Sequence, residues 1–198
     1  MYTGVEPTKY AKKNIKKFNA KISDTYTNKV THVIINKNKN QFKRTVKLMK
    51  ALSTSIPNGG PEIVHEDWVS SCIDKGEVVN ENDFRPSSIP KSAFDKRNAS
   101  TTNIFDGYSI YVTKNVKPPP NELKTIIEMG GGEYCSLAQM KRTKSKQKIC
   151  LTCNDDIKTL EKDILLFDGI YTNEFILSGL VQQQLDGEKF SMKDILYN

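Results

Sequence analysis

The pattern IVHEDWVSSCI at residues 63–73 returns as IYTNEFILSGL at residues 170–180, about one domain length later. Each copy is typical of a short strand followed by a helix. In both helices the apolar residues fall at positions i, i+1, i+4 and i+5, which form a single apolar stripe. A large aromatic residue leads each stripe, Trp68 in one copy and Phe175 in the other, and we expect each ring to anchor a core. The repetition predicts two domains built on one plan.

The segments around these copies also correspond. We expect buried strands at residues 31–35 and 148–152, and an additional strand at residues 108–112 that opens the second copy. A helix-like segment precedes each buried strand and ends in a turn of small residues, at 19–20 in the first copy and 130–132 in the second. The order of elements predicts an α/β fold in which each domain is a small parallel four-stranded sheet flanked by helices.

Composition indicates where the domains meet. The chain has 198 residues, of which 37% are hydrophobic, and this is enough for two domains of about 100 residues each. Residues 87–103 are rich in Ser, Thr, Asn and Pro, as is typical of a linker. We therefore predict a first domain over residues 1–86, a linker over 87–103 and a second domain over 104–198, packed in tandem. Three apolar residues suggest that part of the linker docks against a domain: Ile89, Ala93 and Phe94.

The charge balance favours acidic partners. The net charge is +7 and the pI is about 9.1, which is typical of proteins that meet nucleic acid, phosphopeptides or anionic surfaces. Basic residues gather in two places: Lys12, Lys13, Lys16 and Lys17, and the stretch KRTKSKQK at residues 141–148. Either could bind DNA, or be an ordinary solvated helix face and an exposed loop. No run of about 20 apolar residues occurs, so we expect no membrane contact.

Four cysteines and two histidines are the candidates for metal binding or catalysis. Cys150 and Cys153 form a C-x-x-C, which could bind zinc or act in redox chemistry. On a strand, however, residues three apart point to opposite faces, and no second ligand pair with metal spacing accompanies them. His32 and His65 have no matching nucleophile or metal set. We expect structural thiols in a reducing compartment, no metal, no cofactor and no enzymatic activity.

A possible phosphate-binding set stands apart from these features. Thr3 and Gly4 precede the sequence Arg44-Thr45-Val46-Lys47 by about forty residues. A hydroxyl, a glycine N–H that can approach an anion closely and a lysine ammonium could grip one phosphate together. A phosphate monoester offers about −1.5 to −2 charge and three acceptor oxygens at pH 7.

With its elements in this order, the sequence resembles a tandem BRCT repeat over essentially its whole length. The similarity is to the pairs in DNA-damage checkpoint mediators and in fungal genome-maintenance scaffolds. The motifs that carry it are YTGV at residues 2–5, RTVK at 44–47, DWV at 67–69, GYSIYVT at 107–113, PPP at 118–120 and the glycines at 131–132.

The resemblance implies a phosphoserine-binding module. Thr3 would donate its hydroxyl to the phosphate, Gly4 its backbone N–H and Lys47 its ammonium group. Arg44 would bind the peptide main chain or a free C-terminal carboxylate, although an ordinary salt bridge is the alternative. Three prolines would wall the groove between the repeats, unless they form only a stiff loop: Pro118, Pro119 and Pro120.

The resemblance also implies a partner and a place in the cell. The ligand would be the C-terminal tail of a histone two-A phosphorylated after DNA damage, read in the nucleus by a DNA-damage-response scaffold. Direct DNA binding, or a scaffold without phosphate binding, remains the alternative. The second repeat lacks the R-T-x-K motif around residues 156–165, so one phosphate pocket is expected. Asn19-Ala20 replaces the usual glycine pair of the first repeat, which suggests a slightly strained turn.

Overall fold

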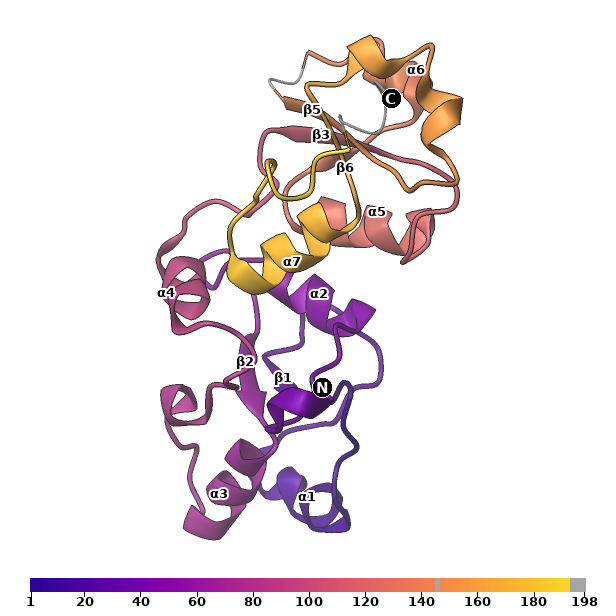
Figure 1. The fold of residues 1–198 in the computed structure, drawn as a ribbon. Coiled ribbons are helices and arrows are strands. Elements are labelled where there is room, and N and C mark those ends of the chain that lie inside the picture. The colour runs from indigo at the N-terminus through magenta and orange to yellow at the C-terminus, as the bar shows by residue number, and fades with distance from the viewer. Residues whose placement is uncertain (145–146, 193–198) are drawn as a thin grey trace.

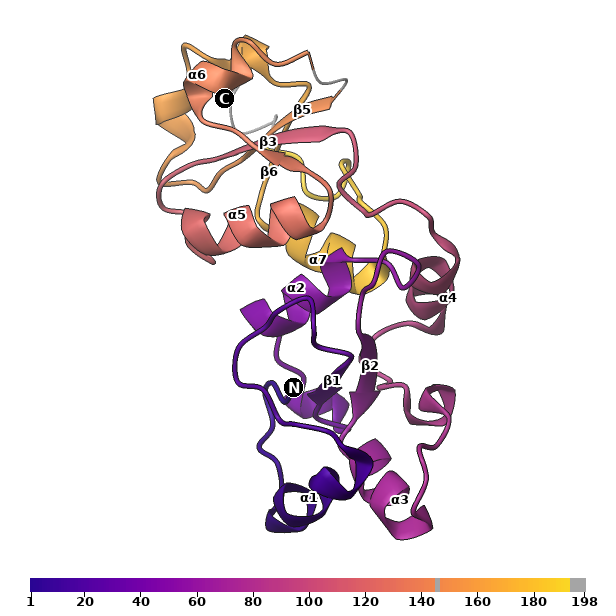
Figure 2. The ribbon, with the colours of Figure 1, turned by 180° about the vertical axis from the view of Figure 1, so that it is seen from behind.

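A computed structural model describes residues 1–144 and 147–192. Two α/β domains lie end to end, with a layer of helices between their sheets (Figure 1). The view from behind shows the same order, with the linker helix beside the junction (Figure 2). In the described part of the chain, no helix is both long and apolar enough to cross a membrane.

The first domain contains a short parallel sheet. Its elements are α1 (Lys9–Asn14), η1 (Ile15–Phe18), β1 (His32–Ile35), η2 (Lys39–Gln41), α2 (Val46–Ser53), β2 (Glu62–His65), α3 (Asp67–Lys75) and η3 (Glu81–Phe84). β1 and β2 pair in parallel, and Tyr2 adds an isolated parallel bridge to Ile34. The sheet described here thus has two strands and one bridge instead of the expected four strands. Gly4, with a φ of 72°, turns the chain away directly after the bridge.

The second domain has the complete sheet. Its elements are β3 (Tyr108–Val112), α5 (Pro120–Met129), β4 (Glu133–Tyr134), α6 (Leu137–Met140), β5 (Gln147–Leu151), η4 (Ile157–Leu160), η5 (Ile164–Leu166), β6 (Gly169–Tyr171) and α7 (Glu174–Gln182). The strands run in the order β4-β3-β5-β6 and every pair is parallel, so the predicted four-stranded parallel sheet is confirmed in this domain.

The aromatic residues that lead the two repeated helices differ in burial. Phe175 is buried and stacks on Tyr171 with the ring centroids 4.2 Å apart, as expected for a core anchor. Trp68 is only partly buried. Its ring stacks on His32, and its indole N–H donates to the carbonyl oxygen of Val79 at 3.0 Å. Trp68 therefore closes the edge of its domain's core instead of filling the centre.

The interface between the domains is a continuous apolar core. Helix α2 of the first domain packs against α5 and α7 of the second, and all three helices lie between the two sheets (Figures 1 and 2). The buried side chains that meet there include Leu48, Met49, Leu52, Leu123, Ile126, Ile127, Ile176, Leu177 and Leu180. Fully burying one such side chain contributes about 1.5–3 kcal/mol. Because this core is shared, α2 holds a fixed position against the second domain.

The linker docks on this junction through helix α4 (Lys91–Ala99). Ile89, Ala93 and Phe94 are all buried, as their apolar character suggested. The guanidinium group of Arg97, which is 1% exposed, donates to the carbonyl oxygens of Ala51 and Thr54 at the end of α2. The domain limits at 86 and 104 stay a prediction.

The turn in which Asn19 and Ala20 replace glycines has a simple geometry. Asn19 ends η1 in the left-handed region with a φ of 53°. Asparagine enters this region more readily than most residues other than glycine, so the substitution keeps the turn at modest cost.

Candidate functional site

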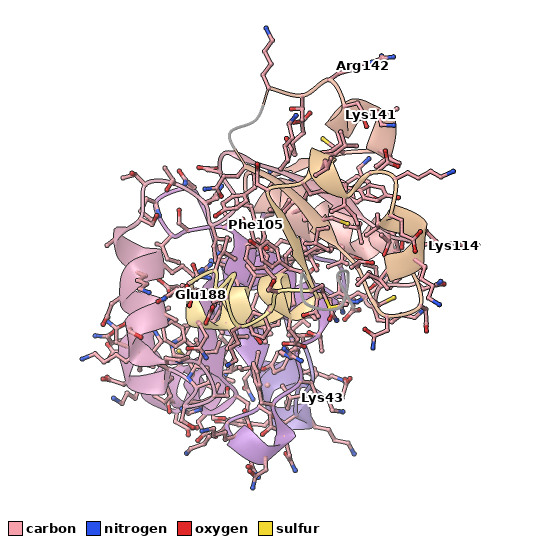
Figure 3. The ribbon with its side chains drawn as sticks, turned by 45° about the horizontal axis from the view of Figure 1, so that its top comes forward. Lys43, Phe105, Lys114, Lys141, Arg142 and Glu188 are labelled. Atoms are coloured by element: carbon pink, nitrogen blue, oxygen red, sulfur yellow. The ribbon has the colours of Figure 1, made fainter. Side chains whose placement is uncertain are left out.

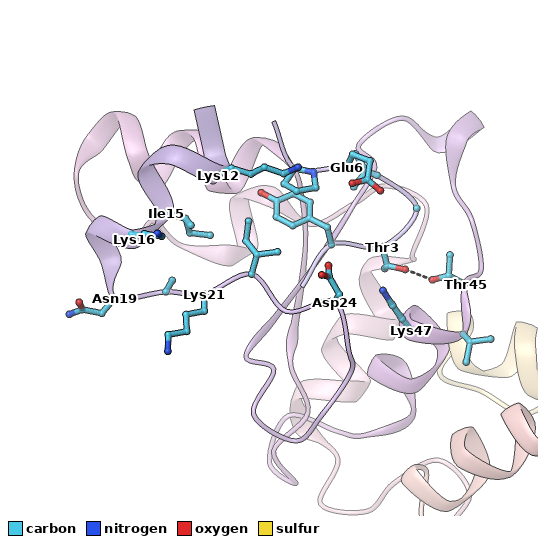
Figure 4. Close-up of a pocket in the computed structure, with 17 residues that line it drawn as sticks. Thr3, Glu6, Lys12, Ile15, Lys16, Asn19, Lys21, Asp24, Thr45 and Lys47 are labelled. Carbon is cyan, nitrogen blue, oxygen red and sulfur yellow. Dashed lines mark hydrogen bonds between the residues drawn. The ribbon is translucent and has the colours of Figure 1, made fainter. Parts of the chain in front are cut away.

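A cavity of about 1150 Å³ opens on the first domain between the N-terminal segment, α1 and the start of α2 (Figure 4). Thr3, Gly4 and Lys47, which are the three residues predicted to hold a phosphate, all line it. They come from separate parts of the chain, and the fold brings them to one place.

The backbone around Thr3 is held by the sheet. The N–H of Thr3 donates to the carbonyl oxygen of Ile34 at 3.0 Å, next to the bridge that Tyr2 makes with the same strand. The Thr3 side chain is buried, and its Oγ1 lies 2.5 Å from Oγ1 of Thr45. This hydrogen bond joins the N-terminal segment to the residue that caps α2.

Gly4 follows with an unusual backbone conformation. A Cβ at this position would meet only ordinary contacts, the nearest being Lys43 Cβ at 3.5 Å. The positive φ, and not lack of space, is thus the reason for glycine here. Among the described residues, the N–H of Gly4 has no acceptor, so it is available to an anion in the cavity.

The start of α2 contributes a cation and a helix terminus. The hydroxyl of Thr45 accepts a hydrogen bond from the N–H of Leu48 at 3.2 Å, which is an N-cap. Lys47 lies in the first turn, and its side chain points into the cavity on the Thr3 side (Figure 4). No ion pair of Lys47 occurs in residues 1–144 or 147–192. The partial positive charge of a helix N-terminus and an unpaired ammonium group both favour an anion at this place.

The cavity also contains charges that the sequence analysis did not assign. Lys12, Lys16 and Lys21 line its α1 side, while Glu6 and Asp24 bring carboxylates. Neither carboxylate lies in a recognisable motif, so only the three-dimensional arrangement reveals it. The cavity is positive overall, with four lysines and two acids in its lining.

Arg44 does not line this cavity, because it is engaged with the other domain. Its Nη1 and Nη2 donate to Oε2 and Oε1 of Glu174 at 2.6 and 2.8 Å, a bidentate pair between the segment before α2 and the start of α7. The hydrogen bond from Arg44 also lowers the pKa of Glu174. The structure thus shows the salt bridge that was the alternative for Arg44. Its predicted contact with a ligand carboxylate stays a prediction.

The three prolines lie near this ion pair and outside the Thr3 cavity. Pro119 and Pro120 form the start of α5, and Pro118 follows Lys117. The carbonyl oxygen of Lys117 accepts a hydrogen bond of 2.6 Å from the side-chain amide of Asn173, the residue before Glu174. Arg44 and the proline segment therefore both adjoin the start of α7. The prolines thus lie at the junction of the two repeats and not in the cavity lined by Thr3. Their role as the wall of a groove stays a prediction.

The second domain has a related backbone arrangement, which holds a buried carboxylate. The N–H of Thr113 donates to the carbonyl oxygen of Leu151, as that of Thr3 does to Ile34. Beside it, the buried carboxylate of Asp156 accepts two hydrogen bonds of 2.6 Å from the backbone and side-chain amides of Asn115. These two donors of Asn115 are thus occupied by a side chain of the same domain. The expectation of one phosphate pocket stays a prediction.

The cysteines and histidines have structural surroundings. Cys150 is buried and Cys153 partly buried, and burial raises the pKa of the Cys150 thiol. His32 lies between Trp68 and the carboxylate of Glu81, with Nε2 3.2 Å from Oε1. In the described residues, no three His, Cys, Asp or Glu side chains are grouped to hold a metal ion.

The two basic stretches are far apart. Lys12 and Lys16 line the cavity of the first domain, whereas Lys13 and Lys17 do not. Lys141 and Arg142 lie at the opposite end of the molecule (Figure 3), where Lys141 pairs with Asp163 at 3.1 Å. Ser145 and Lys146 of the second stretch lie outside the described residues. The two stretches do not form one continuous surface.

The fold defines a class of protein: a tandem pair of homologous α/β repeats, of which the first carries the cavity lined by Thr3, Gly4 and Lys47. Residues 3–73 match the model of the BRCA1 C Terminus (BRCT) domain, and residues 103–191 match that of the BRCT domain. These matches cover more than half of the chain, which therefore belongs to the BRCT family. The resemblance inferred from its motifs is confirmed.

Several curated proteins are similar to this chain. Human mediator of DNA damage checkpoint protein 1 is 27% identical over 162 residues, which cover 78% of this chain and 7% of the mediator. PAX-interacting protein 1 of Bos taurus is 25% identical over 208 residues, with coverage of 96% and 20%. BRCT-containing protein 1 of Schizosaccharomyces pombe is 27% identical over 160 residues, with coverage of 72% and 18%. The chain thus spans a fifth or less of the length of these relatives.

Solved structures have the same fold. The BRCT5-BRCT6 domains of S. pombe Brc1 match with a TM-score of 0.73 and 20% identity, over 98% of this chain and 97% of that one. The complex of Rtt107p with a phosphorylated histone two-A matches with a TM-score of 0.68 and 14% identity, over 96% and 90%. At these identities the likeness establishes the tandem arrangement of the fold.

Proposed function

We propose that this chain is a phosphoserine-peptide-binding module and that the cavity of the first domain holds the phosphate. The observation that carries the proposal is that Thr3, Gly4 and Lys47 line one cavity, in which Lys47 has no ion-pair partner among the described residues. With Thr45 as the donor of the hydrogen bond between the two hydroxyls, the Thr3 proton is free. The Thr3 hydroxyl and the Gly4 N–H then donate to two phosphate oxygens, and the Lys47 ammonium group neutralises the charge. The first turn of α2 adds its N-terminal dipole.

Arg44 then receives the end of the peptide on the side of the second domain. A guanidinium group has five N–H donors, and Glu174 occupies two of them. The remaining donors can bind a main-chain carbonyl or a free C-terminal carboxylate while Glu174 holds the group in place. The segment Pro118–Pro120, next to the start of α7, walls the groove on the same side.

A phosphorylated histone two-A tail is the ligand that the relatives favour. Rtt107p, whose solved complex with a phosphorylated histone two-A has this fold, offers a comparison with a bound ligand. The similar mediators are, by name, proteins of the DNA damage checkpoint, and the chain resembles one part of them. We therefore place this module in a nuclear DNA-damage-response scaffold that reads phosphorylated chromatin and performs no catalysis.

The proposal is tested by titrating a C-terminal phosphoserine histone-tail peptide, and its unphosphorylated twin, against the wild type and Lys47→Met. Charge-assisted hydrogen bonds contribute about 1.5–3 kcal/mol each, so Lys47→Met should weaken binding about tenfold to a hundredfold. Lys50→Met, on the same helix but outside the cavity, should bind like the wild type. Equal affinity for the two peptides would refute phosphate recognition.

The role of Arg44 has its own test. Amidation of the peptide's C-terminus removes the carboxylate but leaves the phosphoserine. If Arg44 clamps the carboxylate, amidation weakens binding to the wild type and has no further effect on Arg44→Gln. If amidation changes nothing in the wild type, Arg44 acts only in the salt bridge with Glu174.

Direct DNA binding is the alternative, and no arrangement among the described residues favours it. The two basic stretches lie at opposite ends of the molecule, and Lys141 is already paired. A DNA-binding role predicts affinity for a plain duplex that falls steeply with salt concentration. Absence of duplex binding at low salt excludes it.

A further inference from the structure

The cavity is much larger than one phosphate requires. Pockets that enclose a drug-sized ligand measure about 300–1,000 Å³, and this open cavity reaches about 1150 Å³. Thr3 and Lys47 lie toward one end of it. Figure 4 shows the cavity continuing past Lys21 to Lys16 and Asn19, away from α2. A peptide that places its phosphoserine at Thr3 leaves this second part of the cavity open to another of its side chains.

The second part of the cavity carries an unbalanced positive charge. Lys12 and Lys16 are four residues apart, and both contribute to the lining of the cavity, as does Lys21. None of the three has an ion-pair partner within the described chain. Like charges at this spacing disfavour a helix slightly, so the fold does not explain their grouping. An anionic ligand group would relieve the repulsion between them.

We propose that Lys12, Lys16 and Lys21 form a second anion subsite, which takes an acidic or phosphorylated side chain that precedes the phosphoserine in the peptide. This inference rests on the proposed function. If the C-terminal end of the ligand meets Arg44 on the side of the second domain, the residues before the phosphoserine leave in the other direction, toward α1. The subsite therefore reads negative charge on the N-terminal side of the phosphoserine.

The same helical segment provides a matched control. Lys13 and Lys17 have the same spacing and the same charge as Lys12 and Lys16, but they do not line the cavity. The double variants Lys12→Gln/Lys16→Gln and Lys13→Gln/Lys17→Gln therefore change the net charge equally. A difference in peptide affinity between the two double variants therefore comes from the lysines that line the cavity and not from the overall charge of the protein.

The experiment measures the affinity of four kinds of phosphoserine peptide for these variants. One peptide has neutral flanks, one carries glutamate before the phosphoserine, one carries a second phosphoserine there, and one carries glutamate after it. The acidic position is moved through the five residues before the phosphoserine. We expect the best-placed anion to tighten wild-type binding about threefold to tenfold, the range for two partly exposed ion pairs. The second phosphoserine should give the larger gain because of its higher charge.

The gain should disappear in Lys12→Gln/Lys16→Gln and persist in the control variant, with the neutral-flank peptide bound equally by both. An equal gain in both double variants would overturn the subsite in favour of general electrostatic attraction. A gain from glutamate placed after the phosphoserine that equals the gain from glutamate placed before it would also overturn the subsite. If the neutral-flank peptide binds no better than its unphosphorylated twin, the phosphate pocket itself is wrong, and this result is distinct from loss of the acidic gain alone.

Discussion

Asp24 places a negative charge in the cavity that is proposed to bind a phosphate. Its carboxylate lies at the same end of the cavity as Thr3 and Lys47 (Figure 4), and it forms no ion pair in the described residues. At separations of several ångströms in a solvated site, one unit charge acts on another with about 1 kcal/mol. Asp24 therefore limits affinity for a phosphate, and it makes binding more dependent on Lys47.

Asp24→Asn should accordingly strengthen phosphopeptide binding about twofold to fivefold, since it removes the repulsion and keeps the side-chain shape. The increase should shrink at high salt because the site is open to solvent. Isothermal titration of the phosphoserine peptide measures it. Asp95→Asn, an exposed change on α4, is the control for net charge. Affinity no higher than that of the control would show that Asp24 does not face the bound phosphate.

At the same scale, the sequence predicts some site residues and not others. Thr3, Gly4 and Lys47 belong to short motifs. When a chain has the fold of the family, the residues of such a motif occupy the same position in that fold. The partner of Arg44 could not be predicted, because Glu174 comes from the other domain and sits in no motif of its own. Asp24 was missed for a similar reason, since it lies in an irregular loop where no periodicity reports its direction.

At the scale of elements, the repeated pattern predicts the helices and buried strands better than it predicts the complete sheets. The strand expected at 108–112 is β3 within the same limits, because the segment is rich in aromatic and β-branched residues and is flanked by turns. In the first domain, residues 21–31 are largely polar and form no strand, and the segment at Tyr2 makes a single bridge. Whether a segment at the edge of a sheet forms a strand depends on tertiary contacts, which a short stretch of sequence does not reveal.

The segment that leads into η4 holds a buried carboxylate, that of Asp156. Burial would raise the pKa of Asp156, but hydrogen bonds from Asn115, Thr113 and Cys153 together outweigh it and hold the pKa below its usual value. A carboxylate whose pKa is lowered in the folded state stabilises that state above its unfolded pKa. This contribution is lost as the pH falls through the lower folded value. Asp156 is thus expected to stabilise the second domain at neutral pH.

Asp156→Ala should lower the free energy of unfolding by about 1–3 kcal/mol at pH 7, because the N–H of Asn115 loses its acceptor. The difference from the wild type should shrink as the pH falls below the usual Asp pKa of about 4. Urea unfolding at several pH values measures both effects. The exposed neighbour variant Asp155→Ala should show neither. A deficit that stays constant down to low pH would mean that packing, and not the ionised carboxylate, stabilises this turn.

At the scale of the whole molecule, the shared core makes the position of the second domain part of the binding site. Helix α2 carries Lys47 on its first turn and Leu52 on its last, and Leu52 is buried in the layer between the domains. The side-chain amide of Gln183, at the end of α7, donates to the carbonyl oxygen of Leu52 at 2.9 Å. The same short helix thus supports the proposed phosphate pocket and joins the two repeats.

Leu52→Ala should therefore destabilise both domains together, by the roughly 2–5 kcal/mol that a buried leucine truncation costs. Trp68 is the only tryptophan, so its fluorescence reports the first domain during denaturation, and hydrogen exchange of β3 and β5 reports the second. We expect both signals to shift to the same lower denaturant concentration, because one core serves both repeats. Ile157→Ala is the control variant for Leu52→Ala, because Ile157 lies in the separate cluster on the far side of the second sheet. If Leu52→Ala lowers the midpoint of one domain and leaves the other unchanged, the repeats fold independently, and α2 does not couple them.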